Sequence, residues 1–111
     1  MQLVAEKVSG VVVVRVAQDR IDAACAIQFK DQMRALAQAG SPKVLLDLQQ
    51  VAFIDSSGLG AIVAVMKALA PAQKLELSGL TSTVKKVFRL TRMDSIFTIH
   101  DALPQHLAQA G

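Results

Sequence analysis

Residues 44–48 (VLLDL), followed after six residues by residues 55–60 (DSSGLG), decide the fold of this chain. The first run is almost wholly apolar, so we expect a strand that is buried on both faces and lies parallel to a neighbour. The second run puts small polar residues where a helix needs its N-cap. Apolar residues then follow helical spacing until Pro71, at Leu59, Ile62, Val63, Met66 and Leu69. The segment therefore predicts a strand that leads into a helix.

On the N-terminal side, the β-branched run 11–16 (VVVVRV) predicts another strand. Residues 3–8, joined to it by Ser9-Gly10, predict its hairpin partner. Asp22 is the expected N-cap of a first helix, which Gly40 ends. The buried face of that helix would carry Ala26, Phe29, Met33 and Leu36.

On the C-terminal side, residues 74–78 (KLELS) alternate and predict a half-buried strand. A third helix, beginning at Thr81 or Ser82, would bury Val84, Val87 and Phe88. A short strand over residues 96–99 would follow. Asp101 would then cap a last helix, with Leu103 and Leu107 facing inward.

The predicted order is β-β-α-β-α-β-α-β-α, which is typical of an α/β fold with a mixed, mostly parallel sheet. We expect four to five strands, about four helices and a single domain over residues 1–111, because 111 residues leave little room for a second core.

Composition excludes several classes of protein. A hydrophobic fraction of 52% and a mean hydropathy of +0.40 are too high for a disordered chain. The longest strictly apolar stretch away from glycine, residues 61–66, is far shorter than the roughly 20 residues of a spanning helix, so we expect no membrane insertion. We expect no signal peptide and, with one cysteine, no internal disulfide, which together favour a cytoplasmic location.

The net charge of +3 has a local origin. Residues 81–93 contain four basic side chains and no acid, and the remaining chain has 8 basic and 9 acidic residues. A basic face on one helix, formed by Lys85, Arg89 and Arg92, is by default solvated, and the alternative is a docking surface for an acidic partner. A basic helix between two strands does not match a helix-turn-helix, so we expect no nucleic-acid partner.

The start of the helix at residues 55–60 is the candidate functional site. Unpaired N–H groups in the first turn of a helix attract anions, including phosphate. Gly58 and Gly60 lack side chains that would keep another surface away from this backbone. The simpler alternative is that Asp-Ser-Ser only caps the helix.

The whole arrangement resembles the STAS-domain family, specifically the bacterial anti-sigma factor antagonists. The resemblance rests on residues 44–48 and 53–60, and more weakly on the element order and the helix containing residues 83–88. It implies a regulatory protein, not an enzyme. Its unmodified form would bind a serine kinase that is also the anti-sigma factor, phosphorylation would block that binding, and a serine phosphatase would reverse it. We expect a chain without cofactor that is a monomer when free.

Carried over residue by residue, the resemblance places Ser56 at the phosphoacceptor position and Asp55 at its flanking acid. Asp22 falls on an aspartate that usually lies near the acceptor. The family commonly has glycine three residues earlier, where this chain has Asp19, and this departure bears on the shape of the loop. Ser57 is the competing acceptor, and would otherwise supply the cap hydrogen bond. The expected partner-binding residues are Asp22, Asp55, Ser57, Gly58, Leu59 and Gly60, with Leu59 either partly exposed or packed in the core.

Other functions have weaker support. STAS domains also serve as cytosolic subunits of membrane transporters, including lipid-transporting ABC systems, and this is the alternative function. Gly58 and Gly60 form only part of a dinucleotide-binding pattern, although Glu76 lies near the distance of a ribose-binding acid.

Cys25 is expected to be a packing residue and not a nucleophile. His100 and His106 have no partner cysteine nearby in the sequence, so we expect no metal site.

Overall fold

The structure is a computed structural model and describes residues 1–38 and 40–104. Its strands are β1 (Leu3–Val8), β2 (Val11–Val16), β3 (Arg20–Ile21), β4 (Lys43–Asp47), β5 (Phe53–Ile54), β6 (Lys74–Ser78) and β7 (Ile99–His100). Its helices are α1 (Ala26–Ala37), α2 (Ser56–Leu69) and α3 (Ser82–Leu90), with one 3₁₀ turn, η1 (Met93–Ser95). Within these residues, no helix is both long enough and apolar enough to cross a membrane.

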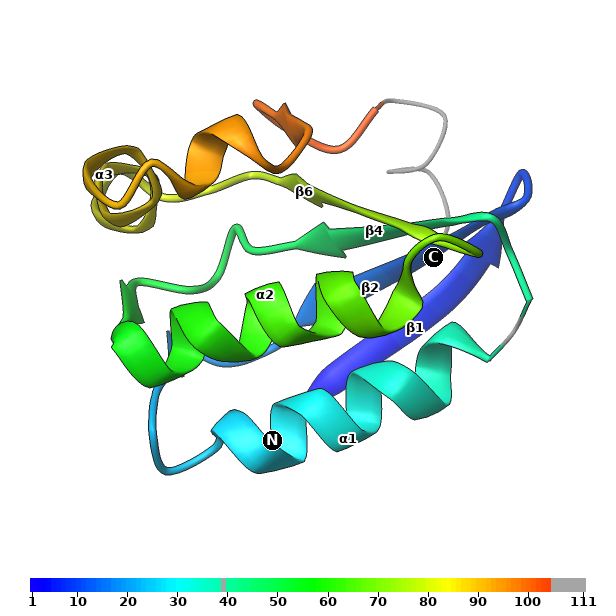
Figure 1. The fold of residues 1–111 in the computed structure, drawn as a ribbon, viewed down its shortest axis with the longest axis horizontal. Coiled ribbons are helices and arrows are strands. Elements are labelled where there is room, and N and C mark those ends of the chain that lie inside the picture. The colour runs from blue at the N-terminus through cyan, green and yellow to red at the C-terminus, as the bar shows by residue number, and fades with distance from the viewer. Residues whose placement is uncertain (39, 105–111) are drawn as a thin grey trace.

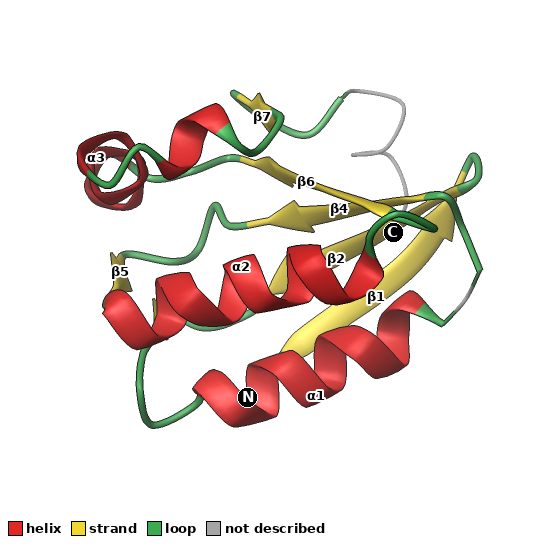
Figure 2. Ribbon diagram, viewed as in Figure 1, coloured by secondary structure: helices red, strands yellow, loops and turns green. Residues whose placement is uncertain are grey.

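Five strands form one mixed sheet in the order β1-β2-β4-β6-β7 (Figure 2). The hairpin of β1 and β2 is antiparallel and the remaining pairs are parallel, as predicted. Ser9 and Gly10 turn the hairpin with φ values of 51° and 79°, a backbone that suits a two-residue loop between twisted strands. β4 is the central strand, and it is buried from Val44 to Asp47, as predicted for a strand covered on both faces.

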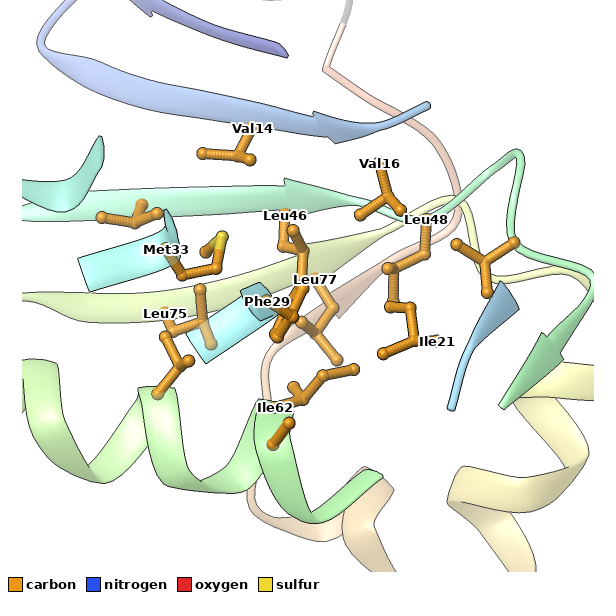
Figure 3. Packing of buried hydrophobic residues seen from close by; sticks show 14 of the residues in the cluster. Val14, Val16, Ile21, Phe29, Met33, Leu46, Leu48, Ile62, Leu75 and Leu77 are labelled. Carbon is orange, nitrogen blue, oxygen red and sulfur yellow. The ribbon is translucent and has the colours of Figure 1, made fainter. Parts of the chain in front are cut away.

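Helices α1 and α2 lie side by side along one face of the sheet, and both begin at the same end of it (Figure 1). Figure 3 shows Phe29 and Met33 of α1 and Ile62 of α2 pointing toward Leu46 and Leu77 of the sheet. These five side chains are inaccessible to solvent. Removing a buried side chain of this size costs about 2–5 kcal/mol, so this layer holds α1 and α2 in place on the sheet.

The first helix starts later than predicted. Asp22 is not its N-cap, because a turn closed by the Cys25 N–H on the Asp22 carbonyl (3.1 Å) delays the helix. Cys25 occupies the N-cap position and packs against the core, as expected of a packing residue.

Two predictions in the second half of the chain are also corrected. The expected strand over residues 96–99 is confined to β7, because the segment before it is anchored by packing: the Phe97 ring contacts the Phe88 ring edge to face, with centroids 5.9 Å apart. Strand β6 is not half-buried, since Glu76 is only 4% exposed. Its carboxylate is satisfied there by His100 (2.8 Å), Lys43 (3.7 Å) and Lys74 (3.6 Å).

The fourth helix predicted after Asp101 has no helical residue up to Pro104, and the remainder of that prediction, including Leu107, lies outside the described residues. Asp101 is exposed, with its carboxylate 4.0 Å from the Lys85 ammonium. Leu103 does face inward, as predicted, but onto the other face of the sheet, where it packs against Val13 and Leu45.

Strands β3 and β5 form a second, two-stranded sheet that no pattern in the sequence predicted. Arg20 pairs with Phe53 and Ile21 with Ile54, in parallel. The carbonyl of Asp19 extends this contact by accepting hydrogen bonds from the N–H groups of Ala52 (2.7 Å) and Phe53 (3.1 Å). The pairing joins the loop that precedes α1 to the loop that precedes α2.

Candidate functional site

The pairing of β3 with β5 brings Asp22 and Asp55 together. Each aspartate follows directly after a paired residue, Ile21 in one strand and Ile54 in the other. The Asp55 N–H also donates to the Ile21 carbonyl, at 3.4 Å. Two residues far apart in the sequence thus stand at matching positions, at the end of the molecule where α1 and α2 begin (Figure 1).

The Asp55 carboxylate connects the two loops. One oxygen accepts a hydrogen bond from the Gly58 N–H (2.8 Å), which caps α2, and the other accepts from the Ala23 N–H (3.1 Å). The hydrogen bond from Gly58 is the main reason why the pKa of Asp55 lies below its ordinary value. Asp55 is therefore a fixed negative charge beside the serines.

Gly58 is buried at the contact between α2 and β3. A Cβ at this position would collide with the backbone carbonyl of Ile21 and lie 2.7 Å from its carbon atom. The absence of a side chain at Gly58 thus allows the close approach of α2 to β3. Gly60, by contrast, is exposed, and a Cβ there would meet nothing within 4 Å.

Ser56 and Ser57 are the first two residues of α2, and both are exposed. The cap hydrogen bond is made by Asp55 and not by Ser57. Among the described residues, neither serine hydroxyl is engaged in a hydrogen bond. Both hydroxyls are therefore accessible, at a helix start whose N–H groups favour a negative charge.

Leu59 is half-buried and packs against the core, so it is both partly exposed and a packing residue. The exposed residues at this end of α2 are Ser56, Ser57 and Gly60.

Asp22 holds the loop before α1 in shape. One carboxylate oxygen accepts a hydrogen bond from the Ala24 N–H (3.1 Å), and the other lies 3.7 Å from the Arg20 guanidinium. Among described residues other than glycine, only Ser9 and Arg92 have positive φ, so Asp19 occupies its position without the left-handed backbone that favours glycine. The departure at Asp19 leaves Asp22 beside Asp55.

Sequence patterns did not indicate a contact between Arg20 and Phe53 at the paired strands β3 and β5. The Arg20 guanidinium lies over the Phe53 ring, 5.1 Å from its centroid, and Phe53 is 42% exposed. The two residues face each other only because β3 pairs with β5, and nothing local in the sequence indicates that pairing.

The other candidate residues lie away from this site. The His100 ring meets Glu76 on the far face of the sheet, and His106 lies outside the described residues. Lys85 and Arg89 are exposed on α3, opposite the buried Val84 and Phe88, as predicted. Arg92 is not on that helical face, because α3 ends at Leu90 and Arg92 adopts a left-handed backbone with φ of 60°.

The chain is similar in sequence to a known protein family and to one of its members. The sequence profile of the STAS domain matches residues 2–106. Over 100 residues the chain is 31% identical to BtrV of Bordetella bronchiseptica, a candidate anti-sigma factor antagonist, covering 89% of this chain and 85% of that protein.

Two solved structures share the fold. One is a candidate anti-sigma factor antagonist from Thermotoga maritima, with 26% identity and a TM-score of 0.83, covering 96% of this chain and 92% of that one. The other is the Bacillus cell fate determinant SpoIIAA in its phosphorylated form, with 20% identity and a TM-score of 0.68, covering 99% of this chain and 100% of that one.

Proposed function

The chain belongs to the STAS-domain family, and from that premise we propose that it is an anti-sigma factor antagonist switched by phosphorylation of Ser56. In its unmodified form it binds a serine kinase that is also the anti-sigma factor. Phosphorylation of Ser56 blocks that binding, and a serine phosphatase restores it. The similarity to BtrV and to the fold of phosphorylated SpoIIAA supports this proposal.

The observation that carries the proposal is the position of Ser56. Its hydroxyl is exposed at the first residue of α2, directly after Asp55, whose carboxylate also holds the loop that contains Asp22. A docking partner would meet the serine and both aspartates on one surface. A phosphate on Ser56 would add about −1.5 to −2 charges and three acceptor oxygens to a site that already contains two carboxylates.

The same geometry supports an effect of phosphorylation on binding and not on the fold. Ser56 is exposed and its hydroxyl supports no contact within the described residues, so the modification displaces nothing from the core. The N–H groups at the start of α2 favour the added negative charge. A partner surface that is itself acidic, or that packs closely over the serine, would be repelled.

The test is a phosphorylation assay with ATP and each serine-kinase anti-sigma factor from the genome that encodes this chain. Mass spectrometry should find a single phosphate on Ser56. Ser56→Ala should abolish the modification, and the matched control Ser57→Ala should retain it. Modification that persists in Ser56→Ala and disappears in Ser57→Ala would move the acceptor to Ser57.

Binding to the kinase should depend on whether Ser56 is phosphorylated. Unmodified protein should bind the kinase, Ser56→Asp should bind it more weakly, and Ser56→Ala should bind it whether or not ATP is present. Treating the phosphorylated protein with a serine phosphatase of the same genome should restore binding. Equal binding by phosphorylated and unmodified protein would contradict the switch.

A further inference from the structure

A groove of about 250 Å³ lies between α1 and α2, lined mostly by exposed residues on the side of these helices that faces away from the sheet. Ile27 of α1 stands on one side, and Ala64 and Ala68 of α2 on the other, above the buried Val65. Alanines leave this wall of the groove shallow, so another backbone can approach closely.

Ile27 is the apolar feature of this groove. It is 70% exposed, although its neighbours Ala26 and Phe29 on α1 are buried. Removing such an apolar side chain from water is favourable. A partner that covers Ile27 in this groove would therefore gain binding free energy from the burial of its side chain.

The charged rim favours an acidic occupant. Lys30 and Arg34 line the groove together with Asp31, whose carboxylate lies 3.5 Å from the Arg34 guanidinium. Since Asp31 offsets one of the two cations, the rim has a net charge of +1. Carboxylates on a partner would complement it and would speed association.

The groove begins about two helical turns beyond Ser56 along α2. Ala64 follows Ser56 by eight residues on α2, a rise of about 12 Å, and the exposed Gly60 lies between them. On α1, Ile27 lies in the first turn, directly after the loop that the Asp55 carboxylate holds through the Ala23 N–H. A partner that covers Ser56 therefore meets the groove at the edge of the same footprint.

We propose that this groove is the second half of the kinase-binding surface and takes an acidic amphipathic helix of that kinase. The inference rests on the proposed function and adds the chemistry of the partner. A helix fits because the groove runs between two neighbouring helices and can accept a row of its side chains. An apolar side chain of the partner packs between Ile27 and Ala64, and its acidic neighbours face Lys30 and Arg34.

The first test substitutes Ile27→Asp and measures calorimetrically the affinity for the kinase that phosphorylates the wild-type chain. Affinity should fall at least 10-fold, because a carboxylate replaces the apolar contact and meets acidic residues. The substitution is compatible with folding, since position 27 is exposed in the first turn of α1, where an acidic side chain is favoured. Leu90→Asp is the matched control: Leu90 is 72% exposed on α3, outside the groove, and its substitution should leave affinity unchanged.

A second test separates charge from apolar contact. Lys30→Glu should lower the association rate several-fold at low salt and less at high salt. Lys86→Glu, an equally simple charge reversal on α3, should not. Unchanged binding by both Ile27→Asp and Lys30→Glu would contradict the proposal that the groove binds the kinase, but it would not contradict the proposed function.

A wild-type chain that neither binds nor is modified by any such kinase contradicts the proposed function and the groove together. Sedimentation of the free protein tests a second copy of this chain as the occupant. A dimer that Ile27→Asp disperses would assign the groove to that copy and overturn the proposal.

Discussion

Helices α2 and α3 begin with similar sequences, Asp55-Ser56-Ser57 and Thr81-Ser82-Thr83, yet the two starts are built differently. At α2 the Asp55 side chain caps its own helix and also binds the loop before α1. At α3 the N-cap Thr81 makes no side-chain cap bond, and its hydroxyl donates instead to the Val51 carbonyl (2.7 Å). Small polar residues thus specify where a helix starts, whereas the pairing of β3 with β5 joins the start of α2 to the loop before α1 and forms a two-loop site.

Replacing Gly58 should give the largest effect on stability, because it disrupts the close contact between the start of α2 and β3. In Gly58→Ala the new Cβ meets the Ile21 backbone and lies 3.0 Å from the Ile54 side chain, so the helix must move away from β3. We expect a loss of about 1–3 kcal/mol in the free energy of unfolding, measured by chemical denaturation.

Gly60→Ala is the matched control for that substitution. The added Cβ meets nothing within 4 Å, and alanine is favoured over glycine inside a helix by about 0.8–1 kcal/mol. The control should therefore be neutral or stabilising. A stable Gly58→Ala variant would show that the close approach of α2 to β3 is not required for folding.

Removing the Asp55 carboxylate should give the second-largest effect on stability, and this effect should depend on pH. Because the hydrogen bond from Gly58 lowers the pKa of Asp55, the folded protein binds this proton less tightly than the unfolded chain does. The stabilisation is therefore present above the ordinary pKa of 3.8 and is lost as pH falls through the lower folded value. Asp55→Asn should lower the melting temperature at pH 7, and the difference from wild type should shrink below about pH 4.

Asp31→Asn provides the comparison for Asp55→Asn. Asp31 is exposed on α1 and its carboxylate lies 3.5 Å from the Arg34 guanidinium, so the loss of stability at pH 7 should be small. A difference between Asp55→Asn and wild type that stays constant from pH 7 to pH 3 would show that the charge of Asp55 does not stabilise the site.

Removing the Thr81 hydroxyl should give a smaller effect, confined to α3. Thr81→Val keeps the shape of the side chain but leaves the carbonyl of the buried Val51 without its donor. A lost hydrogen bond of this kind costs about 0.5–1.5 kcal/mol. Thermal unfolding should report that loss, whereas phosphorylation of Ser56 should proceed at the wild-type rate. A slower phosphorylation would show that the two helix starts are coupled through the Val51 loop.

The main elements of the fold could be predicted because each depends on local patterning. The β-branched run of β2, the hairpin turn at Ser9-Gly10 and the apolar spacing of α2 all act over a few residues, and the structure confirms them. The buried Glu76 could not be predicted, because its burial depends on Lys43 and His100, which come from two other strands.

The site was predictable in part for the same reason. The helix start at Ser56 follows from local sequence, and the resemblance to the STAS family pointed to Asp22. The pairing of β3 with β5, which connects the loop of Asp22 to the helix start at Ser56, could not be predicted. These two strands are two residues each and have no hydrophobic period of their own. The packing of Gly58 against β3 could not be predicted, because the atoms that Gly58 approaches belong to Ile21, more than thirty residues away in the sequence.

A negative charge at the first residue of α2 or of α3 should have the smallest effect on stability, and the two variants compare the two helix starts directly. Ser56 and Ser82 are both exposed and both open their helices. An acidic side chain there interacts favourably with the helix N-terminus by about 0.3–1 kcal/mol, so Ser56→Asp and Ser82→Asp should melt at or slightly above the wild-type temperature. Only Ser56→Asp should weaken binding to the kinase, because only that position lies beside Asp22 and Asp55. Equal loss of binding in both variants would mean that net charge, and not the two-loop site at α2, controls the interaction.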